Sequence, residues 1–399
     1  MQAADQEVPG LGDVLCDEGW AYASALPADA ADPGRFHALF GRDSLVTALA
    51  LLPCRPAVAR ATLRALAALQ GAREDPVWDE EPGKIVHEVR DGVPPGLPDF
   101  LGLPAAEAPL RYYGSADSTP WFLYVLAAAG DAGLQQELEP AWRAAGEWLL
   151  RALRRGGGLL RWGPRARSGG LTQQGWRDAR DPLRSEAHGQ GILREDGTVP
   201  EPPVADADTQ AVAVVGLRAL ARLSGDAAHR DAALGLERRV RAAFGPETLA
   251  LEAGDREVRG AGSQLGWLLW AGCAGAGVAE RLCRPDVLTD FGLRTLSERH
   301  PQFGAHDYHR GAVWPFDSWL GWGGLRAAGR PRDAERVRAG VLDALGRLGR
   351  FPELYAVTAR GPERIAMANQ VQAWTIGARW ALSAGWDGRA ARLCDPRAG

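Results

Sequence analysis

Cysteine, lysine and long apolar runs are scarce in this 399-residue sequence. The five cysteines are widely spaced and include no C-x-x-C pair, so they indicate neither a disulfide framework nor a zinc site. The nucleotide-binding motif G-x-x-x-x-G-K-S/T and the serine-hydrolase motif G-x-S-x-G are missing as well. Lys84 is the only lysine among 46 basic residues, an arginine-rich usage that GC-rich coding explains.

Charge of one sign is also lacking, because 46 basic residues face 50 acidic ones and the net charge is only −4. This balance predicts no broad attraction to nucleic acid or to an anionic membrane. Residues 1–30 carry several acids and no basic, apolar leader, and the weakly polar stretch 266–279 is too short to span a bilayer. We therefore expect a cytoplasmic protein, and the hydrophobic content of 46% excludes a disordered chain.

Helical periodicity dominates what is present, whereas alternating Val, Ile and Thr runs typical of strands are nearly absent. One kind of segment is amphipathic and predicts helices with one face exposed, at 56–70, 140–155, 227–244 and 331–348. A second kind is apolar all round and predicts buried helices, at 43–52, 117–129, 208–223, 264–273, 313–328 and 370–382.

Six buried helices alternating with amphipathic ones predict an all-α fold, an (α/α)6 barrel. We expect residues 1–399 to form this single catalytic domain, without an N-terminal β-sandwich domain. The segments 73–112 and 156–206 are left as long loops, and loops of that length in a compact domain are usually functional.

Polar residues open the predicted inner helices, and the barrel gathers these openings at one end. Taken singly, Arg42 and Asp43 also fit a buried ion pair, and Asp117, Asp208 and Asp317 also fit plain N-caps. Burying all of these side chains together costs free energy unless they are paired or face a cleft, because an otherwise apolar bundle offers them no water. The convergence therefore predicts a binding site at this end.

Two acids in the loops have the surroundings that general acid–base chemistry needs. Asp178 follows Trp176 and a glycine turn, and Glu353 stands in the apolar, aromatic sequence FPELY. Such a carboxylate tends to have a raised pKa or to hold a water molecule for activation. Paired acids, with 15 tryptophans available to line a cleft, predict glycoside hydrolysis. His306 and His309 have no evident third metal ligand, so we expect no metal and no cofactor.

At these motifs the chain resembles the catalytic domain of the amylo-α-1,6-glucosidase (glycogen-debranching) family, which is related to glycoside hydrolase family 63 and to glucoamylases. The resemblance covers nearly the whole chain in family order. It rests on FGRDSL (40–45), PGKIVHEVR (82–90), YGSADSTP (113–120), QGWRDA (174–179), GLRTLS (292–297), YHRGAVWPFD (308–317), PEL (352–354) and QAW (372–374).

The resemblance implies an inverting α-glycosidase in which Asp178 is the general acid and Glu353 the general base. Arg42 and Asp43 match the pair that grips the hydroxyls of the terminal glucose. We assign substrate binding to Phe40, Arg42, Asp43, Lys84, His87, Glu88, Arg90, Tyr113, Asp117, Trp176, Asp208, Gln210, Tyr308, His309, Trp314, Asp317, Gln372 and Trp374.

Two departures from the family leave the substrate open. Bacterial debranching relatives carry a β-rich domain before the barrel, and their Val-Glu-Val-Gln is Ala207-Asp-Thr-Gln210 here. The first interpretation is hydrolysis of a terminal α-glucosidic bond in an α-glucan branch or oligosaccharide. The alternative is a small α-glycoside such as glucosylglycerate or mannosylglycerate. A sugar epimerase using His87, His188 or His309, or a carbohydrate-binding protein, is a further alternative.

The partner we expect is therefore a small or oligomeric carbohydrate, with no nucleic acid and no membrane, for a monomer or a homodimer.

Overall fold

The computed structural model describes residues 7–27, 36–92, 109–163, 170–178, 191–390 and 393. Helices dominate this part of the chain, and the strands are short. The helices are α1 (Gly41–Leu51), α2 (Pro56–Ala68), α4 (Ser118–Ala129), α5 (Ala132–Glu137), α6 (Glu139–Arg155), α7 (Ala207–Ser224), α8 (Ala227–Ala243), α9 (Gln264–Trp270), α10 (Val278–Leu282), α11 (Pro315–Ala327), α12 (Pro331–Leu348) and α13 (Ala373–Ala384), with 3-10 turns at Leu11–Asp13 and Ala253–Asp255.

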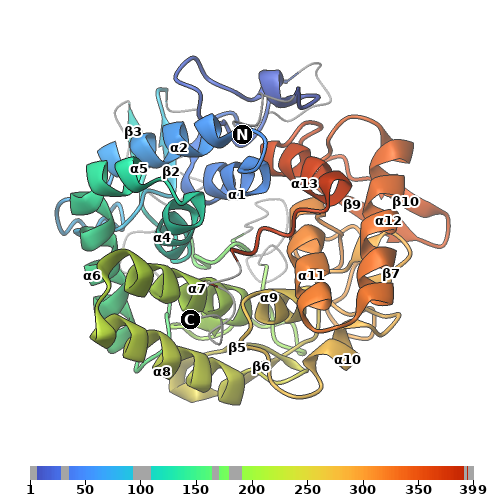
Figure 1. The fold of residues 1–399 in the computed structure, drawn as a ribbon. Helices are drawn as coiled ribbons and strands as arrows, with labels where there is room; N and C mark the ends of the chain where they lie inside the picture. The colour runs from blue at the N-terminus through green and yellow to red at the C-terminus, as the bar shows by residue number, and fades with distance from the viewer. Residues whose placement is uncertain are drawn as a thin grey trace.

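Six of these helices form a closed inner ring (Figure 1). In the order α1, α4, α7, α9, α11 and α13, each packs against the next, and α13 returns to α1. The outer layer consists of α2, α6, α8, α10 and α12, each packed against an inner helix. The predicted (α/α)6 barrel is confirmed.

The alternation of inner and outer helices differs from the expectation in one place. In the described residues, α13 is not followed by an outer helix, and the N-terminal segment covers the corresponding face. Val8, Leu11 and Val14 form an apolar cluster there with Leu51 of α1 and Ile376 of α13. Those residues therefore exclude water from the α1–α13 pair as an outer helix would.

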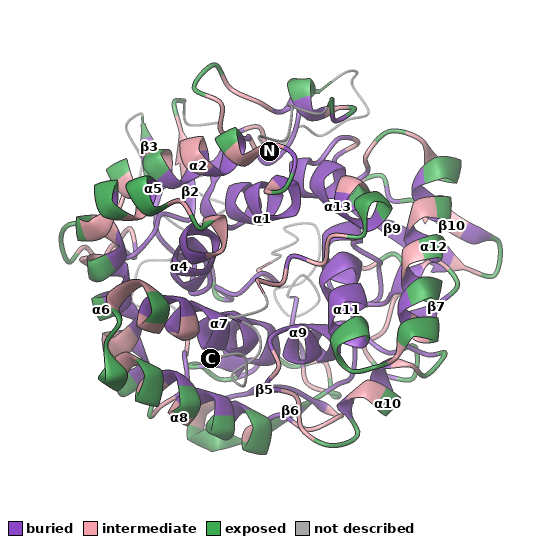
Figure 2. Ribbon diagram, in the orientation of Figure 1, coloured by how far each residue is buried: buried purple, intermediate pink, exposed green. Residues whose placement is uncertain are grey.

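Burial separates the two layers as the sequence pattern predicts (Figure 2). Every residue of α1 is buried, and so is almost every residue of α11. The outer helix α12 buries one stripe, including Val337 and Val341, and exposes the rest. The predicted inner segments match their helices to within about one turn at each end, the usual uncertainty of sequence-based boundaries.

Small residues allow neighbouring inner helices to approach closely. A Cβ on Gly266 of α9 would lie 2.6 Å from the Cα of Gly321 in α11. A Cβ on Gly216 of α7 would lie 2.6 Å from the Cβ of Pro120 in α4. The glycines in these inner helices are therefore packing contacts, although glycine lowers intrinsic helix stability.

Within the described ranges, ten short strands form four small antiparallel sheets that the sequence analysis did not predict. They are β1 (Leu39–Phe40) with β2 (Glu88–Arg90) and β3 (Leu110–Tyr112), β4 (Ala205–Asp206) with β5 (Thr248–Leu251) and β6 (Glu257–Arg259), β7 (Leu288–Thr289) with β8 (Gly292–Leu293), and β9 (Tyr355–Thr358) with β10 (Gly361–Arg364). Strands this short lack the alternating pattern by which strands are recognised. Because β1 leads directly into α1 and β4 into α7, these two sheets lie at the N-terminal end of the inner helices.

The opposite end of the barrel is closed by the segment 385–390, which crosses the ring after α13 (Figure 1). The indole of Trp270 donates a hydrogen bond to the carbonyl of Asp387 at 2.9 Å, and Trp319 donates to Trp386 at 2.7 Å. Trp386 in turn donates to the carbonyl of Leu49 at 2.9 Å. These tryptophans therefore hold the segment that closes this end of the barrel. The N-termini of the inner helices lie at the other, open end.

Candidate active site

The N-terminal ends of the inner helices meet in one network of polar side chains. Arg42 in the first turn of α1 lies 3.4 Å from Asp117, which precedes α4. Gln372, which precedes α13, donates to Asp43 of α1 at 3.3 Å. These polar residues therefore lie close together at one end of the barrel, as the sequence analysis predicts.

Asp178 is held by the guanidinium group of Arg42. Two nitrogens of Arg42 donate to Oδ2 of Asp178, at 3.0 and 2.7 Å, and one of them also donates to the carbonyl of Gly175 at 3.0 Å. The Asp178 side chain keeps 22% of its surface exposed, whereas Arg42 is buried. Burial raises the pKa of Asp178 to about 7, and the positive charge of Arg42 only partly opposes this rise. A carboxyl group of this kind carries a proton near neutral pH.

Glu353 is held at both carboxylate oxygens. The hydroxyl of Tyr308 donates to Oε1, and the backbone N–H of Asn369 donates to Oε2 at 3.0 Å. The Glu353 side chain is buried. The side-chain amide of Asn369 donates a hydrogen bond to Oε1 of Gln372 at 3.0 Å. Hydrogen bonds donated to both oxygens fix the orientation of the carboxylate.

Asp43 connects the two halves of the site. It follows Arg42 on α1 and accepts the hydrogen bond from Gln372, which Asn369 links to Glu353. The pKa of Asp43 is raised to about 8, mainly by burial, with the charges of Asp178 and Glu353 acting in the same direction and the charge of Arg42 opposing them. Asp43 is therefore within electrostatic reach of both carboxylates and is largely protonated at neutral pH.

Aromatic rings form one wall beside these acids. Trp176 packs edge-on to His309 and Trp314, and Trp374 stacks on Phe316 with ring centroids 4.0 Å apart. The ring nitrogens of Trp176 and Trp374 are buried and have no hydrogen-bond partner among the described residues. The Trp314 indole donates to the carbonyl of Tyr308 at 2.8 Å, which holds the segment that orients Glu353.

The strand β2 brings a second group of the predicted residues to Asp178. Nε2 of His87 lies 4.0 Å from Oδ2 of Asp178, and its ring packs edge-on to Phe40. Burial lowers the pKa of His87 well below 6.5, so the ring is neutral there. The carboxylate of Glu88 is paired with Arg90, which in turn lies over the Phe40 ring.

Five of the predicted substrate-binding side chains are engaged within the protein instead. They are Lys84, which donates to the Asp79 carbonyl at 3.0 Å, Tyr113, which donates to the Leu69 carbonyl at 2.9 Å, Gln210, which bonds the backbone of Leu160, Asp208, paired with Arg177 at 2.9 Å, and Asp317, which accepts from Trp267 at 2.6 Å. We leave them out of the proposed sugar subsites because each of these side chains is buried and bound to another part of the barrel.

The interpretation of the aspartates as plain N-caps also needs correction. Asp117 occupies the N-cap position of α4 without a side-chain capping bond, and α7 is capped by Asp206, which accepts from Thr209 N–H at 2.8 Å. Asp208 and Asp317 lie inside the first turns of α7 and α11.

Sequence reasoning missed two residues that organise the site, Arg177 and Asn369. Arg177 directly precedes Asp178, but its partners lie far away in the sequence, and no local pattern marks them. Asn369 lies three residues before Gln372 in MANQVQAW, where it reads as an ordinary loop residue. His188, a candidate for the epimerase alternative, lies outside the described residues.

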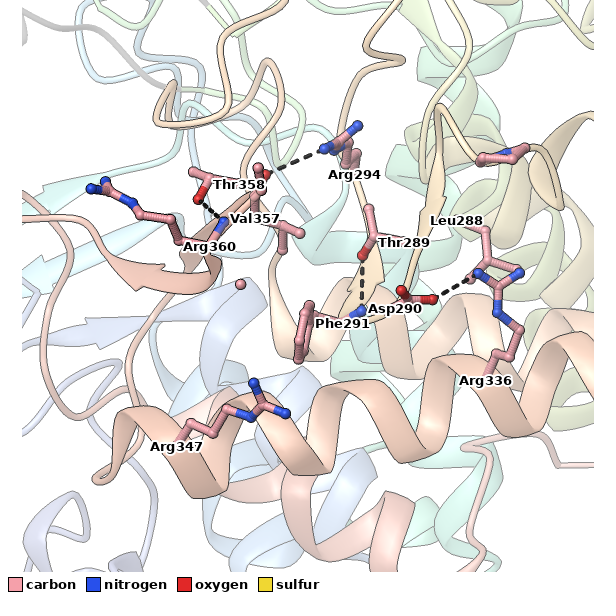
Figure 3. Close-up of a pocket in the computed structure, with 13 residues that line it drawn as sticks. Leu288, Thr289, Asp290, Phe291, Arg294, Arg336, Arg347, Val357, Thr358 and Arg360 are labelled. Carbon is pink, nitrogen blue, oxygen red and sulfur yellow. Dashed lines mark hydrogen bonds and ion pairs between the residues drawn. The ribbon is translucent and has the colours of Figure 1, made fainter.

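A separate surface cavity of about 490 Å³ lies between α12 and the strand pairs β7–β8 and β9–β10 (Figure 3). Four arginines line it, and each has a carboxylate partner, in the pairs Arg294–Glu298, Arg336–Asp290, Arg347–Asp343 and Arg360–Glu363. It shares no lining residue with the network around Asp178 and Glu353. The charge of its arginines is therefore already balanced, and it is distinct from the candidate active site.

Across the described ranges, no three His, Cys, Asp or Glu side chains are grouped to hold a metal ion. No helix in that part of the chain is long and apolar enough to cross a membrane.

Comparisons with known proteins give a family match and several structures of similar fold. Residues 41–356 match the family described as the mannosylglycerate hydrolase MGH1-like glycoside hydrolase domain. A GH63 mannosylglycerate hydrolase from Thermus thermophilus, solved with Tris and D-glycerate, is 17% identical with a TM-score of 0.66, over 92% of this chain and 96% of that one. The glucose complex of that hydrolase is 17% identical with a TM-score of 0.63, over 92% of this chain and 97% of that one. The structure of an uncharacterized conserved protein from the same organism is 17% identical with a TM-score of 0.66, over 94% of this chain and 99% of that one. No curated protein matches this sequence.

The barrel and the family match define a glycoside hydrolase. This chain belongs to the mannosylglycerate hydrolase MGH1-like glycoside hydrolase domain family. The predicted glycoside hydrolase class is thereby confirmed. The debranching resemblance is supported only at this coarser level, and the findings favour the alternative of a small glycoside substrate.

Proposed function

We propose that this protein is an inverting α-glycosidase that hydrolyses a small α-glycoside of glyceric acid, such as mannosylglycerate or glucosylglycerate. The observation that carries the proposal is the unequal treatment of two carboxyl groups at one end of the barrel. Asp178 has a pKa of about 7, whereas Glu353 accepts hydrogen bonds at both oxygens. An inverting glycosidase needs one carboxyl group that donates a proton and one carboxylate that orients a water molecule, and these surroundings suit Asp178 to the first role and Glu353 to the second.

In the proposed reaction, Asp178 protonates the glycosidic oxygen as the bond to the anomeric carbon breaks. Glu353 removes a proton from a water molecule that attacks this carbon from the opposite face, so the product has the inverted configuration. Tyr308 and the Asn369 N–H orient the carboxylate of Glu353 toward that water. Asp43, protonated at neutral pH, donates to a sugar hydroxyl beside Arg42.

The choice of a small substrate is supported by the family description and by the neighbouring structures, whose names concern mannosylglycerate. An α-glucan branch or oligosaccharide is the competing substrate class, on the strength of the debranching-type motifs. The two classes differ in size and in charge, since glyceric acid carries a carboxylate at neutral pH.

The test is a hydrolysis panel of mannosylglycerate, glucosylglycerate, isomaltose, panose and a branched α-glucan, with the first-formed anomer followed by ¹H NMR. We expect turnover of at least one glycerate glycoside, with the β-anomer appearing first. Turnover of the glucans alone would replace the proposed substrate class. An α-anomer formed first would overturn the inverting mechanism, and no turnover on any substrate would overturn the proposed function.

The residue roles are tested with Asp178→Asn and Glu353→Gln, each expected to lower kcat by about 10²–10⁴-fold without unfolding the protein. The matched control is Glu237→Gln, because Glu237 is also a buried glutamate but is paired with Arg218 on the outside of α7. Wild-type kcat in either site variant would contradict its assignment.

A further inference from the structure

Arg177 is buried and contacts several segments of the barrel at once. Its Nε donates to Oδ2 of Asp208 at 2.9 Å, and its terminal nitrogens donate to Ser263 Oγ at 3.1 Å and to the carbonyls of Thr295 at 2.8 Å and His309 at 3.3 Å. The guanidinium plane also lies over the Trp176 ring, 4.7 Å from its centroid. One side chain thus ties the loop 170–178 to α7, to the residue before α9 and to the segment 295–309.

Asp178 and the residue that donates a hydrogen bond to Glu353 each lie one position along the chain from these contacts. Asp178 follows Arg177 directly in the chain, and Tyr308, which donates to Glu353, directly precedes His309. The path from Asp178 through the Arg177 side chain to the His309 carbonyl therefore reaches the segment that orients Glu353. The path is stiff because Arg177 and His309 are joined by a hydrogen bond between buried groups, and because each is bonded covalently to the next residue on the path.

Arg42 and Arg177 hold different parts of the same residue. Arg42 binds the carboxylate of Asp178, whereas Arg177 anchors the backbone that carries it. The planar guanidinium of Arg177 serves acceptors in several directions, which an ammonium group on a flexible chain does not do as well. Oδ1 of Asp208 has no hydrogen-bond partner among the described residues, so this buried aspartate depends on its ion pair with Arg177.

We propose that Arg177 is a positioning residue that sets where the Asp178 carboxyl group stands relative to Arg42 and to Glu353. Asp208, one of the residues first assigned to the substrate, acts in this arrangement as the internal partner of Arg177. The proposal rests on the proposed function for its kinetic consequence. Its structural consequence, the placement of Asp178 beside Arg42, holds independently of the substrate.

The test variant is Arg177→Lys, and the matched control is Arg218→Lys. Arg218 keeps only 9% of its side-chain surface exposed, pairs with Glu237 at 2.7 Å and donates to the backbone carbonyls of Ala271 and Leu393. It lies about 15 Å farther along α7 than Asp208, at the end away from the site. The two variants should lose similar stability, so a difference in catalysis between them reports position and not unfolding.

Catalysis is measured on a glycerate glycoside and on the matching α-glycosyl fluoride, whose leaving group needs little protonation. A displacement of about 1 Å costs about 100-fold in rate. In Arg177→Lys we therefore expect about a 100-fold loss of kcat on the glycoside. The loss on the fluoride should be far smaller, and KM should change little. Arg218→Lys should leave both rates unchanged, and equal losses on both substrates in Arg177→Lys would overturn the proposal.

A second measurement needs no turnover. The Asp178 carboxyl is titrated by ¹³C NMR, its signal being assigned by its loss in Asp178→Asn. Because Arg42 lowers the pKa of Asp178, a displaced carboxyl should titrate above about 7 in Arg177→Lys and at the wild-type value in Arg218→Lys. No change in Arg177→Lys would overturn the proposal. A wild-type protein inactive on both substrates would overturn the proposed function, while this titration still decides the role of Arg177.

If Arg177→Lys fails to fold, Asp208→Asn replaces it, because it keeps an acceptor oxygen and removes only the charge. The same selective loss on the glycoside is expected at smaller amplitude, and equal losses on the two substrates would overturn the proposal.

Discussion

The guanidinium group of Arg42 donates two hydrogen bonds to the same oxygen of Asp178, at 3.0 and 2.7 Å. A cation this close normally lowers the pKa of a carboxyl group. Here burial outweighs it, since the pKa of Asp178 is raised to about 7. Arg42 also lies 3.4 Å from Asp117, so its charge is shared between acids. The result is a carboxyl group that is fixed in place and still able to donate a proton.

The first prediction concerns the alkaline limb of the pH–rate profile. A general acid must be protonated, so kcat/KM should fall as the pH rises through about 7, the pKa of Asp178. Initial rates on the active glycoside between pH 4 and 9 measure this limb. The α-glycosyl fluoride, which needs little acid assistance, is the control and should show a weaker limb. A profile that stays flat up to pH 9 on the glycoside would contradict Asp178 as the acid.

The second prediction concerns stability. The pKa of Asp178 is raised from 3.8 to about 7 in the folded protein, so between these values the folded state binds a proton that the unfolded state lacks. Stability contributed by this protonated group is present below pH 4 and is lost as the pH rises toward 7. The Asp178→Asn variant has no titrating carboxyl group at this position, so it does not lose stability in this way as the pH rises. Its Tm relative to that of the wild type should therefore be higher at pH 8 than at pH 4.

Differential scanning calorimetry of both proteins at the two pH values measures that change. Glu237→Gln, at a buried acid outside the site, serves as the control for any general effect of an amide substitution. A relative Tm of Asp178→Asn that is lower at pH 8 than at pH 4 would show that burial does not dominate the environment of Asp178.

The third prediction is that Tyr308→Phe lowers kcat and leaves KM nearly unchanged. The Tyr308 hydroxyl donates to Glu353, and a hydrogen bond to a charged group is worth about 1.5–3 kcal/mol, or about 10- to 100-fold in rate. Steady-state kinetics on the active glycoside measures the effect. The control is Tyr124→Phe, which removes a hydroxyl that donates to the Gly388 carbonyl at the closed end of the barrel. Equal kcat values in the two variants would show that Tyr308 does not orient the base.

The fourth prediction tests the packing of the inner ring. Gly266→Ala places a Cβ 2.6 Å from the Cα of Gly321, so α9 and α11 must separate, at a cost of about 1–3 kcal/mol. The control is Gly235→Ala on the outer helix α8, where a Cβ meets nothing within 4 Å and should stabilise the helix by about 0.5–1 kcal/mol. Urea unfolding measures both. A neutral Gly266→Ala would show that this contact is loose.

Much of the fold could be predicted because its cause is local. Segments such as 43–52 are apolar on every side, and a helix of that kind is stable only when it is covered all round. The strands could not be found in the same way, since β1 and β4 have two residues each and depend on partners distant in the chain. The N-terminal cover of α1 and α13 was missed for the same reason.

Composition and periodicity thus sufficed to identify a closed ring of buried helices with a polar end, because both properties are carried by neighbouring residues. Which aspartate stays partly exposed was decided only by the tertiary structure. Asp178 pairs with Arg42 and keeps 22% of its side chain exposed, whereas Asp208 pairs with Arg177 in the interior. The two ion pairs join residues that are 136 and 31 positions apart in the chain. Their burial and their electrostatic surroundings therefore form only when the ring of inner helices has closed.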